Sequence, residues 1–200
     1  MSDDKTTRQH IVDAADRLFY RQGYEHTSFS DIADAVRISR GNFYYYFKAK
    51  DEILGAVIEA RLTGTRAMLE HWEAEGKTPM DRLRRFVDML IANRVDIKRY
   101  GCPVGTLCTE MAKLNHPSQA EANKLFTLFR TWLRRQFTLL GQKAGADQLA
   151  MHLLARSQGV ATLANTFHDE AFIRQEVAQM HAWLNSQTAT EKEKRCSSSR

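Results

Sequence analysis

The sequence predicts an all-α protein in which three N-terminal helices are followed by six more. Proline and glycine are scarce, at 3 and 10 of 200 residues, and the stretches between them are rich in Ala, Leu, Arg, Glu and Gln, which are good helix formers. Within these stretches apolar residues recur at steps of three and four, the period of one helix face. With 43% hydrophobic residues, the chain is long enough to bury a core and to divide into a small and a larger domain.

The first helix is expected over residues 6–21, where a regular apolar face is followed by a glycine. Gly23 is placed to end this helix as its C-terminal cap. Ser28 and Asp31 then resemble a capping box, so a short second helix is expected to start there. The apolar face of the first helix consists of Ile11, Ala14, Ala15, Leu18 and Phe19.

The third helix is expected to follow the second after a very short connection. Ser39 is a good N-cap, and Phe43 with Phe47 forms an apolar pair four residues apart on a helix that ends near Lys48. Little more than residues 37 and 38 separates the second and third helices, so the two must cross sharply. That is the helix-turn-helix arrangement.

Six further helices are expected beyond residue 50. The first of them begins with acids at the positive end of its dipole, and the second has Thr78 as N-cap and Pro79 at the first helical position. The expected ranges are 51–75, 79–98, 103–114, 117–143, 147–167 and 169–186. Residues 188–200 are polar without apolar periodicity and are expected to be disordered. We therefore interpret residues 1–50 and 51–187 as two domains, followed by this tail.

Positive charge is concentrated in one short segment. The formal net charge of +5 and the pI near 9.2 permit a polyanionic partner, but such a balance alone is weak evidence. Between residues 37 and 50 the charged side chains are Arg37, Arg40, Lys48 and Lys50. This segment carries four positive charges and no acid, and it is the candidate for contact with a polyanion.

Composition disfavours several other classes of protein. No apolar run approaches the roughly 20 residues needed to span a bilayer, so no membrane partner is expected. The start lacks the apolar region of a secretory signal, and we expect a cytoplasmic protein. Cys102, Cys108 and Cys196 lack the paired spacing of a zinc site or a disulfide framework, so reduced thiols are expected, with no metal and no cofactor.

Two segments carry a resemblance to a known family. They are TSFSDIA at residues 27–33 and SRGNFYYYFKAK at residues 39–50, and they follow a first helix that ends in Leu18-Phe19 and Gly23-Tyr24. In these features the N-terminal part of the chain resembles the TetR family of transcriptional regulators. The remainder resembles that family only in the number and order of its helices.

The resemblance implies a three-helix helix-turn-helix DNA-binding domain joined to a six-helix ligand-binding and dimerisation domain. It further implies that two protomers bind a palindromic operator in double-stranded DNA, and that a ligand releases a repressor from it. The positions that match the family's DNA contacts are Thr27, Ser39, Arg40, Gly41, Asn42, Tyr44, Tyr45, Tyr46 and Lys50. Tyr46 departs from the family pattern, since many relatives carry His there, but both side chains can donate to a phosphate.

The chemistry of the third helix agrees with DNA binding. A short helix fits the major groove of roughly 12 Å and presents its first residues to base edges. Arg40 can donate a bidentate pair to guanine and Gly41 lets the backbone approach closely, whereas the tyrosines and Lys50 can reach phosphates. Phe43 and Phe47 are assigned to the core. Because consecutive helical residues point about 100° apart, at least one of the three tyrosines should be exposed. The alternative is a solvated basic turn.

The central helices are expected to contain a pocket for a small apolar or planar effector. An aromatic lining would suit such a compound, although aromatic residues also form ordinary cores. The candidate lining residues are Phe86, Met89, Leu90, Cys102, Phe126, Phe129 and Trp132, with Leu133 and Phe137 on the same helices.

The last two helices are expected to pair with their two-fold mates in a homodimer, as the resemblance implies. One domain core could also absorb their wide apolar stripes. The apolar positions are Leu153, Leu154, Val160, Leu163, Phe172, Val177, Met180 and Trp183. The small residues that would allow a partner helix to approach are Ala155, Ser157, Gly159, Ala161 and Ala164.

Cys102 is interpreted as a thiol that senses an electrophilic effector. It precedes Pro103, which suits the first position of a helix, and Lys98 and Arg99 add positive charge, so both the helix dipole and these charges would favour the thiolate. Residues 101–110 also resemble a segment found in a branch of the family that includes regulators of the response to reactive electrophiles. The alternative is a small buried residue that packs the helix start.

Two other functions were weighed against a regulator. An enzyme would have to use Cys102, Cys108, His116, His152 or His168, but these residues form no known catalytic spacing, and phosphate loops, nucleophile elbows and paired cysteines are missing from the sequence. We therefore do not expect an enzyme. A DNA-binding or architectural protein without a ligand would keep the first 50 residues, and a wide apolar cavity in residues 80–170 would exclude it. Cys108 is expected to be inert inside a helix, and Cys196 to have no route to the DNA-binding domain.

Overall fold

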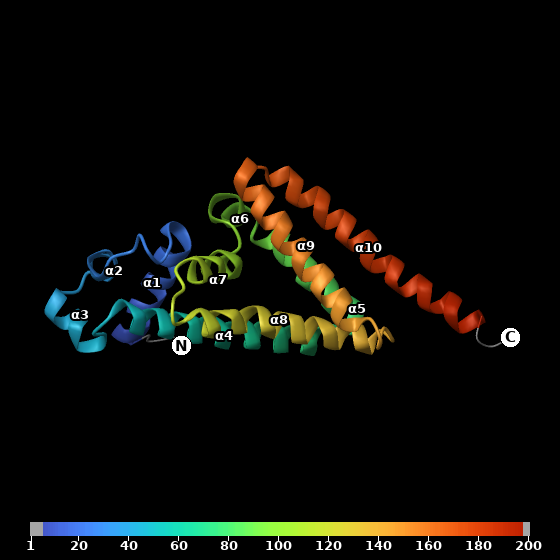
Figure 1. The fold of residues 1–200 in the computed structure, drawn as a ribbon, viewed down its shortest axis with the longest axis horizontal. Helices are drawn as coiled ribbons and strands as arrows, with labels where there is room; N and C mark the ends of the chain where they lie inside the picture. Colours follow the sequence, from blue (N-terminus) through green and yellow to red (C-terminus); the bar gives the residue numbers. More distant parts are fainter. Residues whose placement is uncertain (1–5, 198–200) are drawn as a thin grey trace. The chain divides into compact units, whose positions relative to one another are not determined.

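The computed structural model describes the backbone of residues 6–197 and the side chains of residues 6–39 and 41–187. Over this range the regular structure is α-helical, as predicted, and ten helices are assigned, labelled α1 to α10 in Figure 1. The chain forms two compact units. We call Met1–Thr65 with Pro103–Leu125 the N-terminal unit, and Arg66–Cys102 with Phe126–Arg200 the C-terminal unit.

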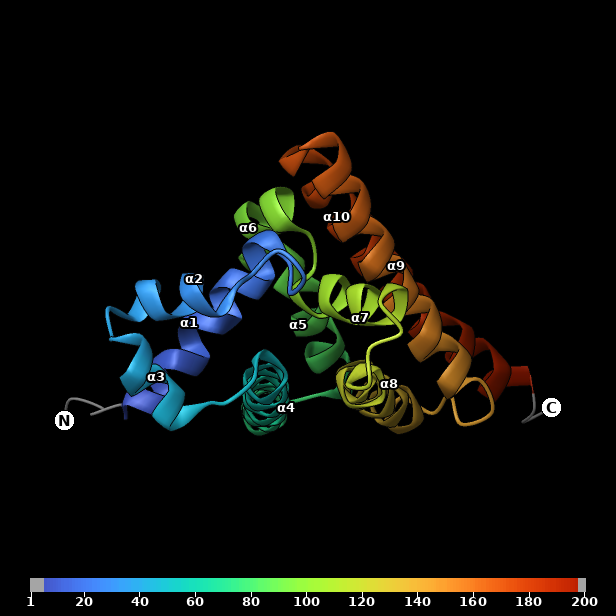
Figure 2. The ribbon, with the colours of Figure 1, turned by 60° about the vertical axis from the view of Figure 1, so that its left-hand side comes forward.

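The N-terminal unit contains more than the expected three-helix domain. Its helices are α1 (Thr7–Gln22), α2 (Phe29–Val36), α3 (Arg40–Tyr46), the first part of α4 (Lys50–Glu75), α7 (Pro103–Lys113) and the start of α8 (Gln119–Leu139). Helix α7 packs on α1, as the second view shows (Figure 2). The predicted boundary at residue 50 follows the order of the chain, whereas packing adds α7 to the N-terminal helices.

The predicted caps define the ends of the first three helices. Gly23 ends α1 with φ at 89°, and its N–H bonds back to the last turn. At α2 the Ser28 hydroxyl accepts the N–H of Asp31 while the Asp31 carboxylate accepts the N–H of Ser28, which is a complete capping box. The Ser39 hydroxyl accepts the N–H of Asn42 at the start of α3. All three caps are confirmed.

A tight turn joins α2 to α3 and produces the helix-turn-helix. Arg37 caps α2 in the left-handed region, with φ at 57°, and its N–H bonds to carbonyls of the last turn. Ile38 and Ser39 then lead directly into α3. Phe43 and Phe47 are buried against the other helices, as predicted, so the orientation of α3 is set by aromatic packing.

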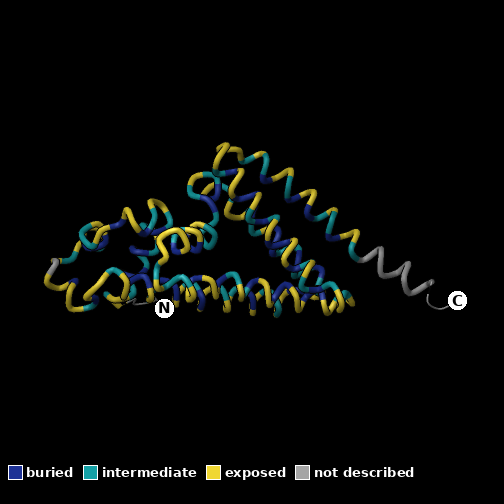
Figure 3. Tube along the Cα trace, in the orientation of Figure 1, coloured by how far each residue is buried: buried dark blue, intermediate teal, exposed yellow. Residues whose placement is uncertain are grey.

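The C-terminal unit is a bundle of long helices. It comprises the rest of α4, α5 (Pro79–Ala92), α6 (Arg94–Tyr100), the rest of α8, α9 (Ala146–Phe167) and α10 (Glu170–Ser197). Helix α10 packs along both α5 and α9, and the buried positions of α9 alternate with an exposed stripe (Figure 3). No helix in the described part of the chain is long and apolar enough to cross a membrane.

The prediction of a single helix over residues 79–98 is wrong, because the structure has two helices there. The helix is interrupted at Asn93, whose φ and ψ of −102° and 10° leave the helical region, and it continues as α6. The Asn93 side chain donates to the carbonyl of Met89, 2.8 Å away. An asparagine that bonds to its own helix in this way competes with the helical ladder, which explains ten helices in place of nine.

The last helix is longer than predicted. Helix α10 continues to Ser197, so the expectation of a disordered segment from residue 188 is wrong for the backbone of residues 188–197. The reason is intrinsic propensity, because Ala, Glu, Lys and Arg predominate between residues 189 and 195, and these residues favour a helix without an apolar face. Residues 198–200 lie outside the described residues, as do the side chains from residue 188 onward.

Candidate nucleic-acid interface

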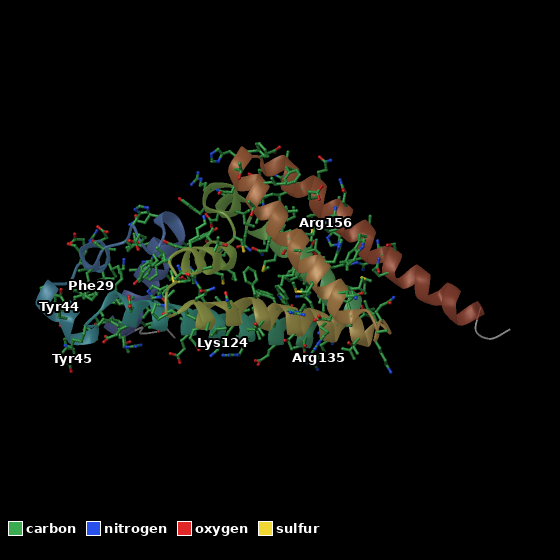
Figure 4. All side chains as sticks on the ribbon, in the orientation of Figure 1. Phe29, Tyr44, Tyr45, Lys124, Arg135 and Arg156 are labelled. Atoms are coloured by element: carbon green, nitrogen blue, oxygen red, sulfur yellow. The ribbon has the colours of Figure 1, made fainter. Side chains whose placement is uncertain are left out.

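Helix α3 has an exposed face that is rich in polar groups. Tyr45 is 77% exposed and Tyr44 is 49% exposed, and both project from α3 in Figure 4. Gly41 and Asn42 are exposed, whereas Tyr46 is half-buried. The prediction that at least one of the three tyrosines is exposed is confirmed.

The N-terminal end of α3 is open to a partner. Ser39 is exposed and caps the helix, and Arg40 follows it as the first helical residue. The Arg40 side chain lies outside the described residues. A Cβ built on Gly41 would meet no atom within 4 Å, so packing inside the protein does not require a glycine at this position.

An aromatic platform lies beside the exposed face. The ring of Phe29 stacks on Tyr44, with centroids 5.3 Å apart and planes 19° apart, and its edge meets Phe43 at 4.8 Å. These three residues, with Ser30 and Ala33, line a shallow hollow of about 190 Å³ between α2 and α3. The stacking holds the Tyr44 ring in place and leaves half of its surface exposed (Figure 4).

Lys50, at the start of α4, contacts the end of α1. Its ammonium donates to the carbonyl of Tyr24 at 3.0 Å and sits 4.1 Å from the centroid of the Tyr24 ring, a cation–π contact. The ammonium is therefore held against the end of α1, and its contact with a phosphate stays a prediction. Lys48 is exposed, and its ammonium donates to the carbonyl of Tyr44.

Thr27 is also held by the α1–α2 turn. The residue is only 1% exposed, and its hydroxyl donates to the carbonyl of Gly23 at 2.7 Å. Thr27 is buried, and the hydrogen bond from its hydroxyl to Gly23 stabilises the connection between α1 and α2. Its contact with DNA stays a prediction.

Tyr24 connects the α1–α2 turn to α4 and to the connection between α7 and α8. Its hydroxyl donates to the carboxylate of Asp51, and burial, followed by this hydrogen bond, raises the pKa of Tyr24 above its ordinary value, so the donor stays protonated. The ring of His116 meets the Tyr24 ring edge-on at 5.1 Å. His116 Nδ1 accepts the N–H of Ser118, so the neutral ring carries its proton on Nε2, 3.6 Å from Asp51. His116, once a candidate catalytic base, is engaged in this structural cluster.

Glu110 of α7 binds the same turn through its carboxylate. One oxygen accepts the N–H of Tyr24 and the other accepts the N–H of Glu25, both at 2.9 Å. These N–H groups directly follow Gly23, where the chain leaves α1. Sequence analysis did not find this contact, because 86 residues separate the partners and nothing local marks Glu110 as a capping residue.

The predicted effector-binding residues lie mainly inside the C-terminal unit. Phe86, Leu90, Phe129 and Trp132 are buried, and Met89, Cys102 and Phe126 are half-buried. The rings of Phe86 and Phe129 are 5.7 Å apart, so the structure brings two of the candidates from α5 and α8 together. Their role in binding an effector stays a prediction.

Comparison with known proteins now assigns the family. Residues 11–57 match the model for bacterial regulatory proteins of the tetR family, and residues 79–179 match the C-terminal domain of LmrA/YxaF-like transcriptional regulators. The chain belongs to the TetR family. This TetR-family chain is therefore a DNA-binding transcriptional regulator of the helix-turn-helix type.

Relatives match over most of the chain. An uncharacterized HTH-type transcriptional regulator in the lacX 3′ region of Lactococcus lactis subsp. lactis is 28% identical over 169 residues, which cover 82% of this chain and 86% of that protein. Transcriptional regulator AcuR of Cereibacter sphaeroides is 30% identical over 151 residues, covering 74% and 67%. The fold matches a TetR transcriptional regulator from Legionella pneumophila with a TM-score of 0.80 at 22% identity, covering 92% and 98%.

The first prediction concerns the Glu110 carboxylate. Glu110→Gln should lower the free energy of unfolding by about 1–3 kcal/mol, because an amide offers one acceptor oxygen where two N–H groups need one each. Urea denaturation measures the loss. The backbone amides of Tyr24 and Glu25 should also exchange faster with deuterium.

The matched control is Glu121→Gln. Glu121 is exposed on α8 of the same unit and pairs with Lys124 one turn away, so its loss should change stability little. Equal stability of Glu110→Gln and wild type, with unchanged exchange at both amides, would show that the carboxylate does not hold the turn.

Proposed function

We propose that this regulator is a repressor that binds a palindromic operator as a homodimer and is released by a small apolar or electrophilic molecule. The observation that carries the DNA-binding part is the exposed face of α3, which lies in a segment with four positive charges and no acid between residues 37 and 50. The usual behaviour of the family supports repression and release. A cytoplasmic location follows from that role.

The geometry supports a division of labour along α3. Its first residues, Arg40, Gly41 and Asn42, meet base edges when the helix enters the major groove. Gly41 has open space around it, so its lack of a side chain serves close approach to DNA. The hydroxyls of Tyr44 and Tyr45 donate to phosphates on the rim of the groove, and contacts of that kind position the protein without reading sequence.

The second prediction separates base reading from phosphate contact. Arg40→Ala should change the preferred base at particular operator positions, with a loss of about 1–3 kcal/mol for each lost bidentate pair. Tyr45→Phe, which removes one hydroxyl, should weaken binding to all sequences alike. Binding-site selection on both variants measures these effects.

Lys143→Gln serves as the control for net charge, because Lys143 is exposed in the connection between α8 and α9. It should leave both preference and affinity unchanged. An unchanged base preference in Arg40→Ala would exclude Arg40 as a base-reading residue.

Helix α9 carries the surface proposed for dimerisation. Its exposed positions at four-residue spacing form a stripe in which small residues are flanked by large apolar ones, namely Met151, Ala155, Gly159, Leu163 and Phe167. A row at this spacing is the ridge used when two helices cross and pack in each other's grooves. Phe167 is 72% exposed, so the end of the stripe is well placed for contact with a second copy.

Several residues expected at the dimer surface belong to the core of their own unit. Leu153, Leu154, Val160, Val177 and Met180 are buried, as are the small residues Ser157, Ala161 and Ala164. Phe172 and Trp183 are half-buried. The sequence indicated a wide apolar stripe on α9. Helices α5, α6 and α10 cover one part of this stripe and leave the other part exposed to a partner.

The third prediction uses the open space at Gly159. A Cβ there would meet no atom within 4 Å, so Gly159→Leu fits the protomer and should favour the helix, while it obstructs a partner helix on the stripe. Light scattering at micromolar concentration should show a dimer for wild type and a monomer for Gly159→Leu. Gly64→Leu, at an equally open position on α4, should remain a dimer. A monomeric wild type would contradict the proposal.

Cys102 supports the electrophile-sensing part of the proposal through its position. It lies directly before α7, half-buried, and α7 starts at Pro103 as expected. The positive charge expected nearby is reduced, because the Lys98 ammonium is 3.7 Å from the carboxylate of Glu170. Cys108 lies inside α7, buried, and its thiol donates to the carbonyl of Ala122 at 3.3 Å. The Cys196 side chain lies outside the described residues.

The fourth prediction is that modification of Cys102 releases the protein from DNA. A quinone or hypochlorite should weaken operator binding of wild type and of Cys108→Ser roughly 5-fold to 150-fold, the usual range of allosteric coupling. Cys102→Ser should resist the treatment. Equal loss of binding in wild type and Cys102→Ser, or no loss in either, would exclude Cys102 as the sensor.

A further inference from the structure

One buried donor in the C-terminal unit lacks an acceptor. Trp132 of α8 is 7% exposed, and its indole N–H has no hydrogen-bond partner among the described residues. Leaving a buried donor unpaired destabilises the folded protein, and a phenylalanine would avoid this cost. In native proteins such a group calls for a specific explanation.

The surroundings of Trp132 are aromatic. The ring of Trp72, from the last part of α4, meets it edge-on with centroids 5.8 Å apart. Phe129 lies one turn before Trp132 on α8 and packs with Phe86 of α5 at 5.7 Å. A flat apolar molecule is the kind of ligand that such rings accept.

The neighbouring polar side chains are engaged with one another. Gln136, one turn after Trp132, is fully buried, donates to Glu73 at 3.2 Å and accepts from Arg82 at 3.4 Å. Arg82 also donates to the carbonyls of Glu73 and Gly76, and Arg135 pairs with the Glu73 carboxylate at 3.0 Å. These groups hold the end of α4 against α5 and α8. The Glu73 carboxylate pairs with Arg135, and the Arg82 guanidinium is held by backbone carbonyls and the Gln136 amide oxygen. The indole N–H of Trp132 is not part of this network.

We infer that Trp132 recognises the effector through its indole N–H, and that the effector is a flat, apolar molecule with one hydrogen-bond acceptor, such as an aryl ketone. The inference rests on the proposed function, since it specifies the ligand class of the proposed effector site. The acceptor supplies the partner that the folded protein lacks, and the apolar character follows from the rings of Trp72, Phe86 and Phe129 around Trp132. A site built around one donor favours a ligand with a matching acceptor over its hydrocarbon analogue.

The fifth prediction compares 1-indanone with indane, which differ by a carbonyl in place of a methylene group. The chain has three tryptophans, so a ¹⁵N–¹H spectrum shows three indole signals, and Trp132→Phe identifies the one that belongs to Trp132. The signal of Trp132 should move downfield with 1-indanone and not with indane, while that of Trp183, identified in the same way with Trp183→Phe, serves as the internal reference. By calorimetry wild type should prefer 1-indanone roughly 2- to 12-fold, the range of one neutral hydrogen bond, and Trp132→Phe should lose this preference.

The outcomes separate this inference from the proposed function. A Trp132 signal that neither compound moves, or that both move equally, overturns the inference. A shift specific to 1-indanone supports the inference, even if 1-indanone does not change operator binding. Unchanged operator binding would then contradict only the proposal that this class of ligand releases the protein from DNA. A compound that releases the operator without moving the Trp132 signal overturns the inference and leaves the proposed function standing.

Discussion

The carboxylate of Glu110 and the two N–H groups that follow Gly23 form the contact on which the geometry of the helix-turn-helix depends. Helix α1 ends in a backbone conformation that a glycine adopts easily, and the next two N–H groups then have no partner in the helix. Glu110 satisfies both at once from α7. The same turn carries Tyr24, whose hydroxyl is held by Asp51 and whose carbonyl is held by Lys50. The turn that leads into α2 is therefore held by Glu110 of α7 and by Asp51 and Lys50 of α4 before any contact with DNA.

Local rules were sufficient for the helices and for the face of α3. The caps at Ser28 and Ser39 follow from residues three positions apart, and the burial of Phe43 follows from helical spacing, so the helix-turn-helix could be predicted from short stretches of sequence. The same rules failed at Asn93, where an asparagine interrupts a helix through its own side chain. They also failed beyond residue 187, where α10 continues to Ser197 through helix-favouring residues without an apolar period.

Contacts between distant segments were beyond the reach of these rules. Thr27 and Lys50 match the family's DNA contacts in position, yet each is drawn inward by a carbonyl of the α1–α2 turn, Gly23 for Thr27 and Tyr24 for Lys50. A motif indicates the backbone position of a side chain, whereas the packing around that side chain determines where its polar group lies. Tyr44 of α3 stays half exposed because the ring of Phe29, which itself packs on Phe43, stacks against it.

Helix α7 is held at two points by α1, α4 and the turn that leads into the helix-turn-helix. Near its start, the Arg61 guanidinium donates to the carbonyl of Pro103 and to the carboxylate of Asp16 on α1, each at 2.6 Å. Two turns later Glu110 holds the α1–α2 turn. A helix fixed at two points transmits a displacement as a rigid body, and it cannot absorb that displacement in one flexible joint. Any event that shifts the start of α7, whether at Cys102 or elsewhere, must therefore either break the Arg61 contacts or move the turn that positions α2 and α3.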